Sequence, residues 1–524
     1  MPVSVTYPGL YIEELPSSAH TITPAPTSIA TFVGYTHPFQ GLCAQAGMWG
    51  QAIQIFSFTD YERIFGGLYR STVLRSDVAD AVYQFFLNGG TNAYVVALQP
   101  RYVDSSTTPP TTHPVTGATG NLSGIAFTSR QLTDTTSRVS VTIRNARVLP
   151  TGNGIADILV TFGSRAEQYR NVTITSGMPD ENFIATRLAS SALVSVAPAG
   201  AAYPNIYDAA PAVLTRDLGD MQQPAGTTTF LNSDFLGVFA ADSSLDKVDI
   251  FNLLVLPGVA DNGIWSSALA FCEHKRAFYI MDPPRRAVAD DSVMGVPKIQ
   301  DLIDTVPHAS PNGALYFPYL MSVDPISSRV IEQPPSGYVA GIYARTDTNR
   351  GVWKAPAGLE TSIINTTGVV PDGRMTDMRQ GTLNPLGVNV LRSFPGAGTV
   401  VWGARTAATN QAFEQWRYVP VRRMALFIEQ TLLRNLGWVV FEPNDEPLWT
   451  AIRLSIEGFM LSLYRQQAFQ GSTPSQAFRV QCDATTTLQT DIDNGIVNIV
   501  VGFRPLKPAE FVVIKIAQLA GQVQ

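Results

Sequence analysis

The feature that most constrains the fold is a strand, helix and strand pattern that occurs on both sides of a long segment of different character. Residues 251–256 are an apolar run, a helical pattern covers residues 264–276, and residues 278–281 form a second apolar run. Wholly apolar strands are typical of sheets covered on both faces. Two parallel strands joined by a helix take a right-handed crossover. The pattern therefore predicts an α/β domain with a parallel sheet.

The same pattern is found near the N-terminus. Residues 32–34 and 94–98 are strand candidates, and the spacing of Val78, Val82 and Phe85 predicts a helix between them. Both halves of the pattern thus fit one α/β domain.

The segment between these halves, residues 105–235, begins with a tract rich in Thr and Pro and continues with short alternating strands at residues 139–143 and 157–161. Loop tips tolerate insertions. We therefore predict a mostly-β domain inserted into an α/β domain that comprises residues 31–104 and 236–380.

The two ends of the chain carry further signals. Residues 1–30 form an arm with two short strand candidates cut off by prolines, so these strands need an outside partner. In the C-terminal domain, residues 381–524, apolar spacing predicts helices over 421–436 and 448–463. The strand candidates there are residues 496–501 and 511–516.

Composition points to assembly rather than to a membrane. Only 15% of the residues are charged, against about 25% in typical domains. Lys fills six of the 36 basic positions, and Arg is the cation that interfaces favour. A GC-rich genome is the alternative explanation for this bias. Residues 15–59 contain no charged residue, but prolines interrupt them, so no membrane span is predicted there. Because the composition points to assembly, we expect this uncharged run to lie against neighbouring subunits.

No motif for catalysis, cofactor binding or metal binding is found. The chain has no Walker A or G-x-S-x-G motif, its five histidines are scattered, and its three cysteines include no C-x-x-C pair. The net charge is −6 and the Arg residues are dispersed, which disfavours nucleic-acid binding. Nothing at the N-terminus has the pattern of a signal peptide. We therefore expect a non-enzymatic protein without cofactor, made in the cytoplasm.

An ordered series of sequence blocks resembles the contractile tail sheath family and leaves only residues 105–235 unmatched. The blocks are YPGLYIEE at 7–14, FVG at 32–34, FFLNGG at 85–90, LVLPG at 254–258, MDPP at 281–284, PPSGYVAG at 334–341, RGVWKAP at 350–356, VWGART at 401–406, WRYVPVRR at 416–423, FEPN at 441–444 and PAEF at 508–511.

The resemblance implies a structural subunit that forms stacked six-fold rings around a tail tube, between a baseplate and a sheath terminator. Such a sheath contracts and drives the tube through a target envelope without consuming nucleotide. The resemblance further implies a subtilisin-like α/β middle domain, an outward-facing inserted domain and an inner C-terminal domain. Assembly would take place in the host cytoplasm, and the product would be a virion tail or an injection particle.

The family resemblance also implies that both chain ends add strands to sheets of neighbouring subunits. The candidate residues are Val3, Val5, Leu10 and Ile12 in the N-terminal arm and Phe511, Val513 and Ile514 at the other end. The alternative is that these strands pair within their own domain.

The tube is expected to contact a helix face of the C-terminal domain. Polar contacts suit an interface that must break, since exposed ion pairs contribute about 0–1 kcal/mol each. Arg453, Glu457 and Arg465 are the candidates, and a solvated face or contacts within the sheath are the alternatives.

Two other function classes stay open at this stage. A subtilisin-like fold could carry an active serine hydrolase, although no triad motif is present. The inserted domain could make the protein an adhesin. Within the sheath family, the sequence leaves a phage tail and a bacterial injection system undistinguished.

Overall fold

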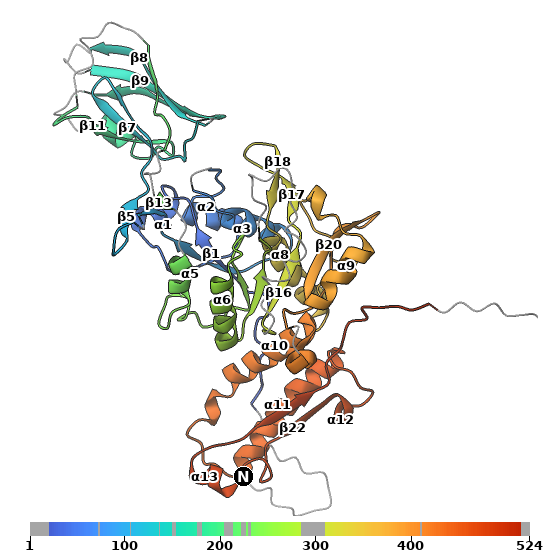
Figure 1. The fold of residues 1–524 in the computed structure, drawn as a ribbon. Helices are drawn as coiled ribbons and strands as arrows, with labels where there is room; N and C mark the ends of the chain where they lie inside the picture. The colour runs from blue at the N-terminus through green and yellow to red at the C-terminus, as the bar shows by residue number, and fades with distance from the viewer. Residues whose placement is uncertain are drawn as a thin grey trace, which may run out of the picture.

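The computed structural model describes residues 20–71, 74–104, 106–135, 137–148, 154–174, 181–203, 213–221, 227–228, 232–284, 310–408 and 411–514. It is a mixed α/β structure of several parts. A central eight-stranded sheet lies between a β-rich body formed by the middle of the sequence and a helical body formed by the C-terminal part (Figure 1).

The central sheet joins both halves of the predicted α/β pattern. Strand β1 pairs in parallel with β3 on one side and with β14 on the other, so the N-terminal half and the later half form one sheet. The six inner strands are parallel, and the two edge strands are antiparallel to their neighbours. In spatial order the strands are β2 (Ala52–Ile55), β3 (Ala93–Leu98), β1 (Ala30–Tyr35), β14 (Leu253–Val255), β15 (Phe278–Met281), β16 (Gly313–Phe317), β20 (Val388–Phe394) and β21 (Gly398–Trp402).

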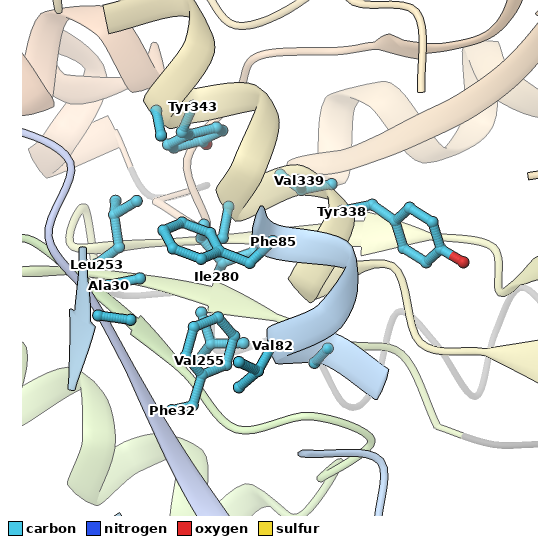
Figure 2. Close-up of a cluster of buried hydrophobic side chains, with 14 of the residues drawn as sticks. Ala30, Phe32, Val82, Phe85, Leu253, Val255, Ile280, Tyr338, Val339 and Tyr343 are labelled. Atoms are coloured by element: carbon cyan, nitrogen blue, oxygen red, sulfur yellow. The ribbon is translucent and has the colours of Figure 1, made fainter. Parts of the chain in front are cut away.

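Both faces of this sheet are covered, as the apolar strands predict. In β14 and just after it, Leu253 and Val255 point to one face and Leu254 and Leu256 to the other. Helices α5 (Asn232–Val238) and α6 (Asn262–Lys275) pack on the Leu254 face. Helices α3 (Val78–Leu87) and α8 (Ser336–Arg350) pack on the opposite face, as Figure 2 shows for Phe85 and Val339.

Close approach of α8 to α3 depends on two glycines. A Cβ at Gly337 would lie 2.5 Å from the Ala81 backbone, and one at Gly341 would lie 2.7 Å from the Phe85 carbonyl oxygen. Both distances are shorter than the closest approach of carbon and oxygen atoms that are not bonded to each other. The two helices therefore pack backbone to backbone, which explains why the block at residues 334–341 contains small residues at this spacing.

The β-rich body has its own hydrophobic core, which includes Phe127, Val141, Ile158 and Leu193. The strands predicted at residues 139–143 and 157–161 are confirmed as parts of β8 and β9. Two sheets form the body, and β4, β5 and β13 form a small sheet where it joins the rest (Figure 1). The strands are β4 (Arg101–Asp104), β5 (Thr111–Pro114), β6 (Thr119–Leu122), β7 (Ile125–Ser129), β8 (Val139–Val148), β9 (Gly154–Phe162), β10 (Arg165–Thr173), β11 (Val194–Pro198), β12 (Leu214–Asp217) and β13 (Thr227–Thr228).

The C-terminal body is built on the two helices expected from apolar spacing. Helix α10 (Val419–Asn435) and helix α11 (Glu446–Arg465) pack together in one hydrophobic core. This core includes Met424 and Ile428 on α10 and Ile452 on α11. A two-stranded sheet of β22 (Phe478–Gln481) and β23 (Val500–Phe503) packs beside α11. The strand expected at residues 496–501 thus begins later, at Val500.

One expected boundary is wrong. Residues 381–524 were predicted to form a C-terminal domain, yet β20 and β21 complete the central sheet, with β20 parallel to β16. Local pattern identifies a strand but not its neighbour, so the sheet to which β20 belongs could not be read from the sequence. The remaining elements are α1 (Gly41–Ala46), α2 (Phe58–Phe65), α4 (Ile184–Arg187), β17 (Leu320–Val323), β18 (Val330–Gln333), β19 (Gly368–Val369), α9 (Asp377–Leu383), α12 (Pro474–Ala477) and α13 (Gln489–Asp493).

The glycine contact leads to a prediction. We expect Gly341→Ala to lower the free energy of unfolding by about 2 kcal/mol, because overpacking costs more than the roughly 1 kcal/mol that alanine gains in a helix. Gly458→Ala in α11 is the control, since a Cβ there meets nothing within 4 Å. Chemical denaturation should show that only the control keeps or gains stability, and equal effects of the two changes would contradict the close contact.

Candidate assembly surfaces

The place where an α/β sheet would hold a ligand is filled by the chain itself. Strand order reverses between β1 and β14, and open α/β sheets bind ligands at the carboxyl ends of strands at such a reversal. Gly258, just after β14, donates its N–H to Asp282 Oδ2 at 2.9 Å. A Cβ at Gly258 would lie 2.4 Å from Asp77 Oδ2, so the two segments are in direct contact.

Ser336 and Asp282 form the contact most similar to a catalytic pair. The Ser336 backbone N–H and Oγ donate to the Asp282 carboxylate at 2.8 and 2.6 Å, and both residues are fully buried. In a Ser-His-Asp triad the serine hydroxyl is bonded to a histidine base, and the carboxylate is bonded to that histidine. Among the described residues no histidine is bonded to Ser336, and His37 Nδ1 instead accepts the backbone N–H groups of the loop that follows it. The contact therefore fixes the start of α8.

Burial changes the ionisation of the carboxyl groups at this edge. Desolvation by burial raises the pKa of Asp77 to about 7, with Asp80 and Asp282 adding to the rise and Arg75 opposing it. Burial also raises the pKa of Asp282 to about 6, against the hydrogen bonds from Ser336 and Gly258. Both groups thus bind a proton up to a higher pH in the folded protein than an exposed aspartate does.

A buried ion pair joins the C-terminal body to the central sheet. Arg423 on α10 donates to both oxygens of Asp347 on α8 at 2.8 and 2.6 Å, and each side chain is only 3% exposed. The guanidinium also lies 4.6 Å from the centre of the Tyr343 ring and donates to the Thr27 carbonyl oxygen at 2.9 Å. Three distant parts of the chain therefore meet at Arg423.

Residues 20–29 run along α10 as an anchored strap. Asn435 bonds both the N–H and the carbonyl oxygen of Thr23 at 2.9 Å, and Thr431 Oγ1 accepts the Ala25 N–H at 3.1 Å. His20 stacks on Trp438 with ring centres 4.0 Å apart. The uncharged run was expected to lie against neighbouring subunits, but residues 20–29 of it are held by their own chain.

The C-terminal segment is held at Glu510 and then becomes exposed. Glu510 accepts hydrogen bonds from Arg405 at 2.8 and 2.6 Å, while Phe511 and the next three residues are 74–80% exposed. Residues 506–511 form one wall of a groove of about 940 Å³, whose other wall includes Trp353 and Trp402. No strand partner for residues 511–514 is found in the described part of the chain.

The two-stranded sheet of the C-terminal body has outer edges without a strand partner among the described residues. Val500 on β23 is 50% exposed. A two-stranded sheet alone is marginally stable in water, and a free edge is a template for a strand from another chain. This sheet is therefore a candidate acceptor.

The predicted site residues fall in different environments. Val3, Val5, Leu10 and Ile12 lie outside the described residues. Phe511, Val513 and Ile514 are exposed and belong to no helix or strand.

The candidates for tube contact all lie on α11 but differ in their contacts. Arg453 donates to the Cys482 carbonyl oxygen at 2.7 Å, so it binds within its own body. Glu457 is half-buried and Arg465 is exposed. Their contact with a tube remains a prediction.

Four residues of these contacts, Arg423, Asp347, Arg405 and Glu510, were not predicted from the sequence. All except Asp347 lie in blocks that carry the family resemblance, which is the signal that could have identified them. Within the described residues, no helix is long and apolar enough to cross a lipid bilayer, and no group of three or more His, Cys, Asp or Glu side chains could hold a metal ion.

Comparison with known proteins identifies similar chains. The model of the phage tail sheath protein central domain matches residues 240–407, and that of the phage tail sheath C-terminal domain matches residues 411–518. The tail sheath protein of Vibrio phage KVP40 is 26% identical over 198 residues, which cover 37% of this chain and 28% of that protein. The tail sheath protein of Burkholderia phage BcepMu is 29% identical over 161 residues, or 30% of this chain and 33% of that protein.

The alignments thus span about a third or less of these two relatives. The fold is similar over a much longer range. The sheath of the extracellular contractile injection system PVC, in its contracted state, matches with a TM-score of 0.57 and 22% identity over 99% of both chains.

The buried ion pair leads to a prediction. Asp347→Asn should lower the free energy of unfolding by about 3 kcal/mol, because it leaves the Arg423 charge buried without its partner. Glu360→Gln is the control, since it removes an exposed pair with Arg350 and should cost less than about 0.5 kcal/mol. Similar losses in chemical denaturation of the two variants would argue against the role of the buried pair.

The buried carboxyls predict a pH dependence. Because the folded pKa of Asp77 is raised, its contribution to stability is complete below about pH 4 and is lost as pH rises through about 7. His37, whose pKa burial lowers to about 3, contributes in the opposite sense, so the variant must be compared with the natural chain. Between pH 5 and pH 7.5 the free energy of unfolding should fall by about 1–2 kcal/mol less in Asp77→Asn than in the natural chain. If the free energy of unfolding falls equally in both proteins over this pH range, Asp77 does not cause the pH dependence.

Proposed function

Because the chain belongs to the phage tail sheath protein family, we propose that it is the repeating subunit of a contractile sheath, stacked in six-fold rings around a tail tube. The baseplate and a terminator would bound the sheath, and contraction would drive the tube through a target envelope. The finished particle would be a virion tail or an injection particle assembled in the host cytoplasm.

One observation carries this proposal: the apolar segment Phe511–Ile514 is exposed, and the sheet of β22 and β23 has edges without a strand partner among the described residues. Four consecutive exposed apolar residues are unfavourable in water. Main-chain hydrogen bonds to a neighbour's sheet edge would bury them and fix their register. Donation of a strand to another subunit explains both features.

The N-terminal end supports the same mode of assembly. The strap at residues 20–29 holds the root of the arm on α10, so residues 1–19 start from a fixed point. Val3, Val5, Leu10 and Ile12 would then form donated strands. Two arms from each subunit would keep the rings linked while the subunits move.

The energy of contraction would come from the lattice itself. The carboxyl edge of the sheet is occupied by the chain's own Gly258, Asp282 and Ser336, which leaves no evident nucleotide or substrate site there among the described residues. A metastable extended lattice that relaxes to one with more buried contact supplies work without catalysis. The middle domain would share the subtilisin-like fold without its chemistry.

The positions of the other parts follow from the same reasoning. The β-rich body projects from the central sheet on the side away from the C-terminal body (Figure 1). An outward-facing insertion and an inner C-terminal domain that contacts the tube through α11 fit this arrangement.

The arm proposal can be tested by substitutions on alternate positions of the first strand. Val3→Asp with Val5→Asp places charge on the apolar side, and Ser4→Asp with Thr6→Asp adds the same charge to the polar side. We expect the first variant to form at least about tenfold fewer sheaths, since a buried unpaired charge costs several kcal/mol. Negative-stain microscopy and sedimentation measure the yield.

Both variants should keep the thermal midpoint of the natural subunit, because under this proposal the first strand contacts a neighbouring subunit and not the folded body of its own. Normal sheaths from the Val3→Asp, Val5→Asp variant would mean that this strand is not donated.

A further inference from the structure

The C-terminal segment is fixed by a single carboxylate. Glu510 Oε1 accepts from Arg405 Nε at 2.8 Å and from Asn384 Nδ2 at 3.0 Å. Glu510 Oε2 accepts from Arg405 Nη2 at 2.6 Å and from the Tyr418 hydroxyl at 3.3 Å. Four hydrogen bonds thus converge on one side chain, and the two from Arg405 form a bidentate pair, the strongest geometry for a carboxylate.

The receptor for Glu510 is itself rigid. Arg405 Nη1 donates to the Asn384 carbonyl oxygen at 2.9 Å, and its backbone N–H and carbonyl oxygen both bond the Asn389 side chain at 2.7 Å. Arg405 also forms a β-bridge with Tyr418, which precedes α10. The three donors come from the end of α9, the end of β21 and the start of α10, so the central sheet and the C-terminal body both contribute.

The charges of this cluster are partly shielded from water. The side chains of Arg405 and Glu510 are 13% and 20% exposed. Burial alone would raise the pKa of Glu510, but the hydrogen bonds and the charge of Arg405 outweigh it and hold the pKa below its ordinary value. Glu510 is therefore ionised and paired at neutral pH.

Packing of the segment on the body is incomplete, because residues 506–511 line an open groove. The groove of about 940 Å³ lies between residues 506–511 and a wall that includes Trp353 and Trp402. Exposure also changes sharply after Glu510, since Phe511 is 74% and Val512 80% exposed. Glu510 is thus the last fixed point of the chain before the exposed segment.

We propose that Arg405, Asn384 and Tyr418 form a receptor for Glu510 that sets the direction in which the C-terminal arm leaves the subunit. This inference rests on the proposed function, in which that arm reaches a neighbour. An arm with a fixed direction loses less conformational entropy on binding and has a higher effective concentration at its acceptor. Glu510 is therefore a positioning residue for assembly.

Distances between spin labels on the unassembled subunit test the proposal. The labels are attached at Val512→Cys and at Thr490→Cys on α13; the native cysteines are buried and leave labelling to the introduced sites. We expect one narrow distance distribution in the parent protein and one about twofold wider after Glu510→Gln or Arg405→Gln. The control is Glu414→Gln, which removes an exposed pair with Arg417 and should leave the distribution narrow.

The variants must keep the thermal midpoint of the parent protein, which shows that they remain folded. The double variant Glu510→Arg with Arg405→Glu exchanges the two charges and should narrow the distance distribution again. A distribution that stays narrow after Glu510→Gln overturns the proposal.

Sheath assembly by the same variants separates the two proposals. A wider distribution with about tenfold lower sheath yield supports both the receptor and the arm. A wider distribution with normal yield supports the receptor but counts against a role of the C-terminal arm in assembly.

Discussion

The buried ion pair between Arg423 and Asp347 is the contact on which the arrangement of this protein depends. It lies between α10, α8 and the strap at Thr27, and so connects the C-terminal body, the central sheet and the root of the N-terminal arm. Breaking a buried pair leaves an uncompensated charge, which is much more costly than losing a surface pair. Loss of either partner would therefore weaken the contact between the C-terminal body and the central sheet.

The central sheet shows how a fold common among enzymes is used as a scaffold. At the carboxyl edge, where a ligand would bind, Asp282 accepts three hydrogen bonds from Gly258 and Ser336. These bonds tie the end of one strand to the loop after another and to the start of α8. The same geometry that exposes a site in an enzyme here locks the helices onto the sheet.

The described chain is held to the body at fixed points near both of its ends, at residues 20–29 and at Glu510. The strap uses the side chains of Thr431 and Asn435 to bond main-chain groups, and Glu510 uses its carboxylate to bond three donors. At the strap these bonds add to an apolar contact, since Ile22 is buried in the core of the C-terminal body. At Glu510 charge-assisted hydrogen bonds hold the segment beside an open groove.

The sequence by itself determined the elements and the family. The periods of Val78, Val82 and Phe85 and the apolar run at residues 251–256 identified helices and a covered sheet, because these patterns are local. The tertiary structure alone decided that β20 joins that sheet and that Arg423 meets Asp347, 76 residues away, and Arg405 meets Glu510, 105 residues away. Partners at such separations are brought together by the packing of whole elements, and no local periodicity records which of the dispersed charges will meet.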